Sequence, residues 1–498
     1  MLSLLFGSCQ TRKTEKQAAL YNSYCASCHI APDIGSLPKD IWAQNILPEM
    51  AARMGIRDNG YDPMSGLKYE EMEAVHASGI YPLRPIMALE DWQLLKEYIV
   101  DLAPDSLSSS VYDRSNKKLE QFLIRSISLD EEPGSYNTFL KYRAENNRLW
   151  AGDIHGRLLE YDFETASTKQ LGTFESAVVD YTEKDRIGYL TAVGKLDPSE
   201  TSSGKIILTT PNGQEPLPLT LHRPVNNLVL DLDADGSDEL VVSEFGHLTG
   251  SLSLLYRDPA GEIAKKTLLP QPGTIRTLAR DINRDGKMDL IALTSQGDET
   301  ITILYQQEDL VFSAVKALRF SPVYGSSWFD ILDYDGDGHL DIVTVNGDNA
   351  DKSYVQKPYH GLRIHLNDGQ NNFKESYFYA MNGATRFAAE DFDMDGDVDF
   401  AIISTFPDYD NRPEFSFVYL ENQNASQFQF QSYTLAEYDW SRWFLMDTGD
   451  VDKDGDTDII LSSFTYVFTP VPDSFSKKWY EKNVDLLVLE NTYSDKKP

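Results

Sequence analysis

The spacing of apolar residues divides the chain into two parts. In residues 19–104 apolar positions recur with the period of an α-helix; near the end of this part, Trp92, Leu95 and Ile99 would share one helical face. Beyond this part, short alternating apolar runs are separated by Gly, Asp and Asn, a pattern typical of strands and tight turns. The sequence therefore predicts a small all-α domain followed by a larger all-β domain.

Three helices are expected in the first part, over residues 16–24, 39–47 and 90–100. Pro48 follows the second of these and is expected to break it, because proline lacks the backbone N–H that a helix interior requires. A Ser-rich stretch at residues 105–116 is a predicted linker. At 498 residues the chain is long enough for such a division into domains.

One acidic motif recurs five times in the second part. It reads D-x-[DN]-x-D-G-x-x-[DE] followed by an apolar residue, and its copies begin 50, 52, 58 and 59 residues apart, at Asp231, Asp281, Asp333, Asp391 and Asp450. Repeats of about 50 residues with several strands each are typical of β-propeller blades.

Two further blades are expected where the motif has degenerated. One has a loop at residues 180–185, which lies 51 residues before Asp231, and the other has strands within residues 138–163. The total is about seven blades. The last blade is one strand short, and residues 117–128 resemble the fourth strands of other blades, so we expect this segment to complete the ring and remove an open sheet edge.

Positions 1, 3, 5 and 9 of the motif are candidate metal ligands, because alternate residues of a tight loop can turn their oxygens toward one cation. An EF-hand is excluded, since its twelfth position needs Glu and all five copies carry an apolar residue or Thr there. The candidates are Asp231, Asp233, Asp235, Glu239, Asp281, Asn283, Asp285, Asp289, Asp333, Asp335, Asp337, Asp341, Asp391, Asp393, Asp395, Asp399, Asp450, Asp452, Asp454 and Asp458.

Across roughly residues 180–491 these repeats resemble FG-GAP/VCBS repeats, as found in integrin-type and many bacterial extracellular propellers. The resemblance implies a calcium-stabilised β-propeller with about five Ca²⁺ ions. Weak, structural binding is expected, with dissociation constants of about 10⁻⁴–10⁻³ M as in other extracellular modules.

The helical part carries a second chemical motif, Cys25-Ala-Ser-Cys28-His29. C-x-x-C-H is the attachment signature of a c-type haem, with two thioether bonds and the histidine as the proximal iron ligand. A four-ligand zinc site would need further cysteines, and the chain has only one more, Cys9. The order of the helices resembles a class I cytochrome c domain. The cofactor expected here is therefore one covalent haem c.

An electron carrier would use a methionine as the second iron ligand. Met50 is favoured, because residues 46–55 resemble the ligand segment of bacterial cytochrome–FG-GAP fusions. Met54, one helical turn further on, and Met87, just before the last helix, remain alternatives.

The N-terminal segment ending at Cys9 resembles a bacterial lipobox, which implies a lipid anchor on this cysteine and a place in the cell envelope, periplasmic or at the cell surface. The expected divisions are residues 1–18 as a signal remnant and tether, 19–104 as the haem domain, 105–116 as the linker, 117–492 as the propeller and 493–498 as a tail.

The net charge of the chain limits the kinds of partner that it can bind. The formal net charge is −33, and five divalent cations would bring it to −23, which argues against nucleic acid and anionic membrane surfaces. Apart from a lipid anchor we expect no membrane contact, since no apolar run is long enough to span a bilayer.

Three functions are compatible with these features. The favoured one is a cell-envelope electron-transfer protein, a carrier and not an enzyme, whose propeller docks a redox partner protein or envelope complex. An alternative is a dehydrogenase-type oxidoreductase with substrate bound at the channel mouth by Arg276, Arg386 and Trp328, which lie five residues before three acidic loops. The third is an adhesive or ligand-binding propeller.

Overall fold

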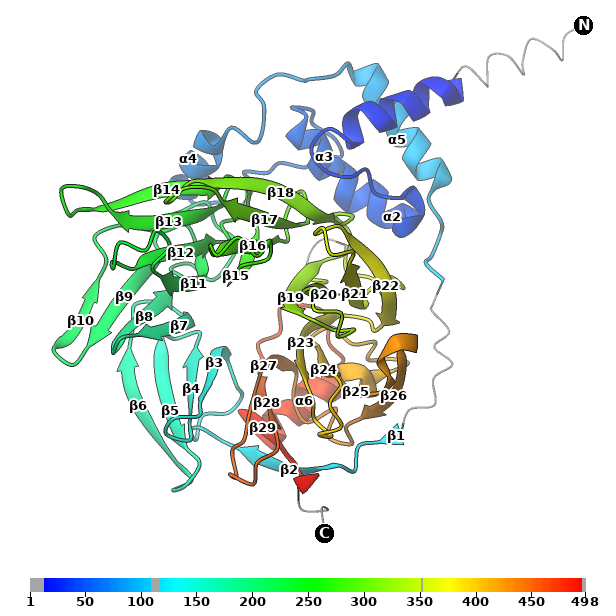
Figure 1. The fold of residues 1–498 in the computed structure, drawn as a ribbon. Helices are drawn as coiled ribbons and strands as arrows, with labels where there is room; N and C mark the ends of the chain where they lie inside the picture. The colour runs from blue at the N-terminus through cyan, green and yellow to red at the C-terminus, as the bar shows by residue number, and fades with distance from the viewer. Residues whose placement is uncertain (1–12, 109–116, 351–352, 495–498) are drawn as a thin grey trace, which may run out of the picture.

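The computed structural model describes residues 13–108, 117–350 and 353–494. A helical unit lies at one side of a ring of seven sheets arranged around a central axis (Figure 1). The expected seven-bladed β-propeller is thus confirmed. No helix of the described part is long and apolar enough to cross a membrane.

The helical unit is built from short elements. Helical residues 13–20 run into a π-helical turn, and the following elements are η1 (Tyr21–Cys25), η2 (Ile34–Ser36), α2 (Lys39–Ile41), η3 (Trp42–Ile46), α3 (Leu47–Arg53), α4 (Tyr69–Ser78) and α5 (Leu89–Leu102). Glu90 and Asp91 in the first turn of α5 favour its N-terminal dipole. The predicted apolar face of this helix, Trp92, Leu95 and Ile99, is buried.

The prediction that Pro48 breaks the second helix was wrong. The chain stays helical from α2 through η3 and α3 to Arg53. The wider π-helical turn is the reason: the Leu47 N–H donates to the Trp42 carbonyl, five residues back. Pro48 directly follows this turn, at a point where the regular i→i−4 hydrogen-bond pattern is already interrupted.

The strands of each blade lie side by side and antiparallel. The first strand is nearest the central axis and the last is at the outside. Blade 1 contains β3 (Asn137–Arg143), β4 (Arg148–Asp153), β5 (Arg157–Asp162) and β6 (Ser167–Thr173); blade 2 contains β7 (Val178–Lys184), β8 (Ile187–Ala192), β9 (Lys205–Thr210) and β10 (Gly213–Pro216); blade 3 contains β11 (Pro224–Leu230), β12 (Glu239–Glu244), β13 (Ser251–Arg257) and β14 (Ile263–Leu269); blade 4 contains β15 (Thr274–Arg280), β16 (Asp289–Thr294), β17 (Thr300–Gln306) and β18 (Phe312–Arg319).

Blade 5 contains β19 (Ser326–Leu332), β20 (Asp341–Asn346), β21 (Gly361–Asn367) and β22 (Phe373–Ala380); blade 6 contains β23 (Ala384–Glu390), β24 (Asp399–Ser404), β25 (Phe417–Asn424) and β26 (Gln429–Thr434); blade 7 contains β27 (Trp443–Gly449), β28 (Asp458–Ser463), β29 (Leu486–Asn491) and β2 (Phe122–Ile127). Short helical elements lie within blades 6 and 7, namely η4 (Pro413–Ser416), η5 (Ala425–Gln427) and α6 (Asp473–Lys482).

The second strand of each acidic-loop blade is the centre of the core. All six residues of β12, β16, β20, β24 and β28 are buried. Neighbouring blades cover both faces of these strands, so their sequences are continuous apolar or small runs and do not alternate. The apolar clusters correspondingly join side chains of adjacent blades.

The ring closes between the two ends of the propeller chain. In the segment expected to complete the last blade, β2 pairs antiparallel with β29 from Phe122–Asn491 to Ile127–Leu486. The short strand β1 (Lys117–Lys118) pairs in parallel with β26 and adds a fifth strand to blade 6, which the sequence did not predict.

The degenerate loop expected at residues 180–185 is not a loop. Residues 178–184 form strand β7, and a tight hairpin follows at Asp185 and Arg186, both with positive φ. Two consecutive left-handed residues are the geometry of a two-residue hairpin turn, which leaves no room for the acidic loop of the other blades.

The helical unit docks on the face of the propeller opposite the acidic loops. The buried Glu71 carboxylate of α4 accepts hydrogen bonds from the Ser199 and Thr201 hydroxyls, both at 2.8 Å, and pairs with Lys195 at 3.1 Å. Burial opposes its ionisation, yet these hydrogen bonds hold the pKa of Glu71 well below its usual range. Residues 195–201 connect β8 to β9, whereas the acidic loops connect the first and second strands of their blades.

The closure contact predicts a difference between two neighbouring positions of β2. Phe122 is 4 % exposed and packs edge-on against Phe392 and Tyr419, whereas Leu123 is 62 % exposed. Phe122→Ala should lower the free energy of unfolding by about 3–5 kcal/mol. The control Leu123→Ala should change it by less than about 0.5 kcal/mol. Chemical denaturation measures both, and equal effects would contradict a closing role for β2.

Candidate functional site

The C-x-x-C-H motif begins where the first helical segment ends. Cys25 is the last residue of η1, and Cys28 and His29 lie in the turn that follows. Both thiols are free, with Cys25 half-buried and Cys28 exposed. Burial raises the pKa of the Cys25 thiol to about 11, so this sulfur is protonated at neutral pH.

The imidazole of His29 has one nitrogen engaged. Its Nδ1 lies 2.8 Å from the carbonyl oxygen of Ile30, and because a carbonyl only accepts, Nδ1 carries the proton. In the neutral ring Nε2 then presents its lone pair. A hydrogen bond from the other ring nitrogen to a backbone carbonyl is the usual second contact of a metal-ligating histidine.

The three candidate methionines all pack in one apolar cluster together with Cys25. The Met54 carbonyl accepts the Ile86 N–H at 3.0 Å, which places the segment carrying Met87 beside the end of α3. Met87 is buried, whereas Met50 and Met54 are half-buried. The fold thus brings all three methionines to the cluster that contains Cys25, and it leaves the choice among them open.

The same cluster contains a polar atom without a partner. The indole of Trp92 is 1 % exposed, and its Nε1–H makes no hydrogen bond to any residue that the structure describes. A buried donor is normally satisfied. The two thiols and the oriented imidazole are the groups that attachment of a c-type haem requires, and the methionines of this cluster are candidates for a second iron ligand.

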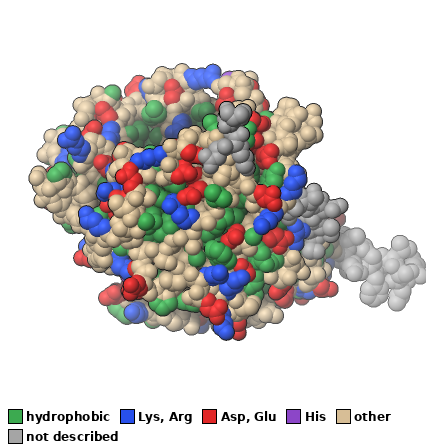
Figure 2. Space-filling model, turned by 90° about the horizontal axis from the view of Figure 1, so that it is seen from below, with side chains coloured by type: hydrophobic (Ala, Val, Ile, Leu, Met, Phe, Trp, Pro, Cys, Tyr) green, Lys and Arg blue, Asp and Glu red, His purple; other side chains and the backbone are tan. Residues whose placement is uncertain are grey.

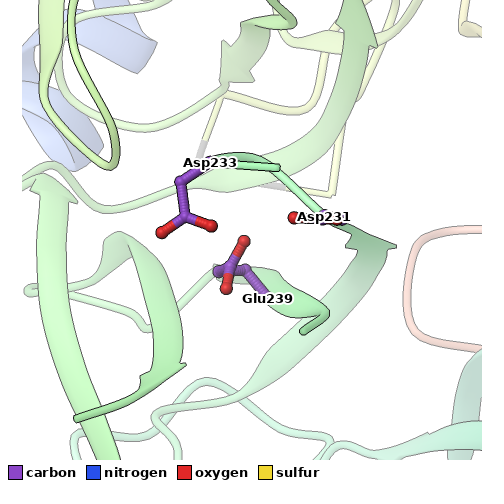
Figure 3. Close-up of side chains that lie close together, drawn as sticks. All are labelled: Asp231, Asp233 and Glu239. Carbon is purple, nitrogen blue, oxygen red and sulfur yellow. The ribbon is translucent and has the colours of Figure 1, made fainter. Parts of the chain in front are cut away.

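Four of the acidic loops gather carboxylates. Oxygens of motif positions 1, 3 and 9 lie within 4.8 Å of one another in the loops that begin at Asp231, Asp333 and Asp450. Figure 3 shows Asp231, Asp233 and Glu239 of the first of these loops converging on one point. In the fourth group the residues are Asp391, Asp393 and Asp395, at positions 1, 3 and 5.

The loop that begins at Asp281 differs from the other four. Its third position is Asn283, whose amide donates to Asp285 at 3.1 Å, and no such group of acidic side chains forms in this loop. Sequence reasoning placed this loop among five equal sites. The asparagine supplies a neutral oxygen and leaves a weaker ligand set.

Hydrogen bonds from backbone N–H groups to side-chain carboxylates fix the shape of every acidic loop. The glycine at position 6 donates its N–H to the position 1 carboxylate, as Gly338 does to Asp333 at 2.9 Å, and its positive φ permits the turn. The position 5 carboxylate accepts the N–H of position 7, as Asp337 does from His339 at 2.7 Å. These contacts explain why Asp and Gly occupy these positions even without a metal. Other carboxylate oxygens still point toward the centre of the loop.

Position 9 has a second role that sequence reasoning missed. Asp341 accepts the N–H of Tyr334 at 2.9 Å with one oxygen and the N–H of Asn367, at the end of the third strand, at 2.8 Å with the other. The same bridge from position 9 to a third-strand residue recurs in three other blades. An asparagine at the end of the third strand, Asn367, Asn422 or Asn491, was the signal that could have revealed it.

Several of these carboxyl groups have raised pKa values. Burial, together with the charge of neighbouring carboxylates, raises the pKa of Asp341 to about 6 and that of Asp399 and Asp458 to about 7. Like charges gathered in a partly buried loop resist joint ionisation. A divalent cation would remove this penalty.

The three channel residues lie together. Arg276, Trp328 and Arg386 are each the third residue of the innermost strand in three consecutive blades, β15, β19 and β23. The guanidinium of Arg276 lies 3.7 Å from the centroid of the Trp328 ring, and that of Arg386 lies 4.0 Å from it. Arg276 also pairs with Asp330 at 3.3 Å. Cys9, the candidate lipidation site, lies outside the described residues.

Comparison with known proteins supports the class of the second domain. Residues 281–344, which contain two of the acidic loops, match the family described as FG-GAP-like repeat. With the ring of seven blades, the chain is therefore a seven-bladed β-propeller that carries an FG-GAP repeat.

Solved structures similar to this chain include two other domains. The WD40 domain of Pan2 from Neurospora crassa is 10% identical, with a TM-score of 0.42, over 75% of this chain and 97% of that one. The N-terminal domain of Nup159 is 10% identical, with a TM-score of 0.40, over 77% and 99%. A comparison with curated proteins gave no match.

Proposed function

We propose that the protein is an electron-transfer protein with one c-type haem attached to Cys25 and Cys28. The observation that carries the proposal is the C-x-x-C-H motif with His29 oriented by the Ile30 carbonyl, beside a cluster of three methionines. When bound, the haem supplies a one-electron iron couple.

The residues of the helical unit would hold and tune this group. The His29 Nδ1–H donates to a backbone carbonyl, which fixes the ring orientation and increases the basicity of Nε2. Met50 is the proposed second ligand, with Met54 and Met87 as alternatives. The apolar side chains of Leu37, Trp42 and Leu95 would keep water away from the bound group, and the Nε1–H of Trp92 would be available as a hydrogen-bond donor to it.

The propeller would serve as a rigid base for docking a redox partner. Hydrogen bonds to Glu71 and the bond from the Tyr359 hydroxyl to the Ser36 carbonyl, at 2.9 Å, fix the helical unit on it. Acidic and basic side chains are intermixed on the face shown in Figure 2. The net charge of −33 nevertheless favours a basic partner and a salt-dependent encounter.

Calcium is the proposed metal of the acidic loops. Carboxylate oxygens without nitrogen or sulfur donors suit a hard cation, and Ca²⁺ accepts the irregular geometry of such loops. Because position 9 also bridges two strands of its blade, bound ions would stabilise the sheets and not act as sensors. A lipid on Cys9 would tether the protein in the cell envelope, where c-type haem is attached.

The first prediction concerns haem attachment. After expression with a c-type maturation system, the full chain should carry one haem that survives denaturing electrophoresis and stains for peroxidase activity. Cys25→Ser together with Cys28→Ser should abolish the stain, because both thioether bonds are lost. The third cysteine supplies the matched control, and Cys9→Ser should keep the stain. A haem-free wild-type chain would refute the proposed function.

The second prediction concerns the sixth iron ligand. With a thioether in place, the ferrous absorption spectrum should be low-spin and unchanged by carbon monoxide. Met50→Ala should open the site, so that carbon monoxide shifts the spectrum, whereas Met54→Ala and Met87→Ala should behave like the wild type. A response in one of these controls instead would transfer the ligand role to that residue, and a response in the wild type would contradict the carrier function.

The third prediction concerns calcium. At 2 mM free Ca²⁺ and a dissociation constant of about 10⁻⁴ M, each occupied loop should add about 2 kcal/mol to stability, so a chelator should lower the melting temperature reversibly. Asp335→Asn should remove one ion per chain by elemental analysis. Asp185→Asn, in the hairpin without an acidic loop, should remove none. A melting temperature indifferent to chelator would rule out structural calcium.

A further inference from the structure

The Arg–Trp–Arg stack in the propeller channel is not needed by the proposed electron transfer. Two guanidinium groups within 4.0 Å of one ring centroid cannot share one side of the ring, so Arg276 and Arg386 lie on opposite faces of Trp328. They come from the blades on either side of the blade that carries the tryptophan. The three residues thus form one continuous stack along the inner wall.

The two arginines differ in how their charge is balanced. Arg276 pairs with Asp330, although its buried Nε–H has no partner among the described residues. Arg386 makes no hydrogen bond and no ion pair within the described part of the chain, and its guanidinium lies against the indole face of Trp328. Arg386 is half-buried, and none of its guanidinium nitrogens is a buried atom without a partner among the residues that the structure describes, so its five N–H donors are open to solvent or to a ligand in the channel.

The nearby acids form no ion pair with Arg386, although the charge of Asp180 acts on it from further away. Asp180 accepts the backbone N–H of Asn227 at 2.7 Å and the Asn226 amide at 3.1 Å, and Asp447 accepts the N–H of Tyr142 at 2.6 Å. Glu390 is bonded by the Thr448 hydroxyl. These hydrogen bonds hold the carboxylates in place, and none of the carboxylates lies within ion-pair distance of Arg386.

The pKa values of the two arginines reflect the same shortage of balancing negative charge. Burial, and then the charge of Arg276, lowers the pKa of the Arg386 guanidinium to about 9, and burial also lowers that of Arg276. Two like charges on one aromatic ring repel each other, and a bound anion would relieve both the repulsion and the loss of solvation.

We propose that the channel binds a small oxyanion, a carboxylate or a phosphate, on the guanidinium of Arg386. The planar fork of donors matches two oxygens of such a group. Arg276, on the other face of Trp328, adds positive potential. The carboxylates along the wall repel a polyanion, so the ligand carries one or two charges. This site is independent of the haem and would give the propeller a ligand of its own.

The test is calorimetric titration of the full chain with inorganic phosphate and with succinate, at constant ionic strength. Binding of one of them should weaken by roughly tenfold or more in Arg386→Met, which keeps much of the stem but loses the charge-assisted hydrogen bonds. Arg280→Met, at the exposed end of β15, is the matched control and should bind like the wild type. Comparison of the two probes separates a phosphate from a carboxylate ligand.

Two results would overturn the proposal: no binding of either anion by the wild type, or equal binding by Arg386→Met. Should that variant fail to fold, crystals of the wild type soaked in selenate give a second measurement. An anomalous peak within hydrogen-bond distance of the Arg386 guanidinium supports the site, and its absence at full soak overturns it.

Discussion

The pairing of β2 with β29 is the constraint on which the rest of the molecule depends. Each blade buries its apolar faces only against its two neighbours, so a ring that is open at one joint exposes two faces and one sheet edge. The joint is made by a strand from the start of the propeller chain and three strands from its end. Gln121 strengthens it by donating to the Phe392 carbonyl at 3.0 Å and to the Asn491 side chain at 3.1 Å.

The acidic loops and the helical unit lie on opposite faces of the closed ring. All five acidic loops join the first and second strands of their blades, so they share one face, whereas the helical unit sits on the loops of the other. The acidic loops are therefore separated from the C-x-x-C-H motif by the full depth of the sheets, so the two groups of candidate ligands belong to different faces of the molecule.

The acidic loops show how one residue can serve both the fold and a ligand. At position 9 both oxygens of Asp341 accept backbone N–H groups, and the same side chain belongs to a group of three converging carboxylates. Its raised pKa reflects burial and the charges around it. A cation bound there would lower the repulsion between the carboxylates without replacing the strand bridge.

The sequence by itself determined the elements whose signal is local. The period of the acidic repeat gave the blades, because each copy forms the same turn through its own Asp and Gly residues, and the spacing of Trp92, Leu95 and Ile99 gave the last helix. The family match to residues 281–344 rests on the same repeat. The C-x-x-C-H motif likewise predicts haem attachment from five consecutive residues.

Other features depended on contacts between distant residues, which a linear pattern does not contain. Pro48 did not end its helix, because the hydrogen-bond pattern already changes in the π-helical turn before it. Asp180 belonged to a strand and not to a loop, and Asn283 set one acidic loop apart from the others. Only the tertiary structure stacked Arg276 and Arg386 on Trp328, because the packing of consecutive blades decides which side chains of their inner strands meet.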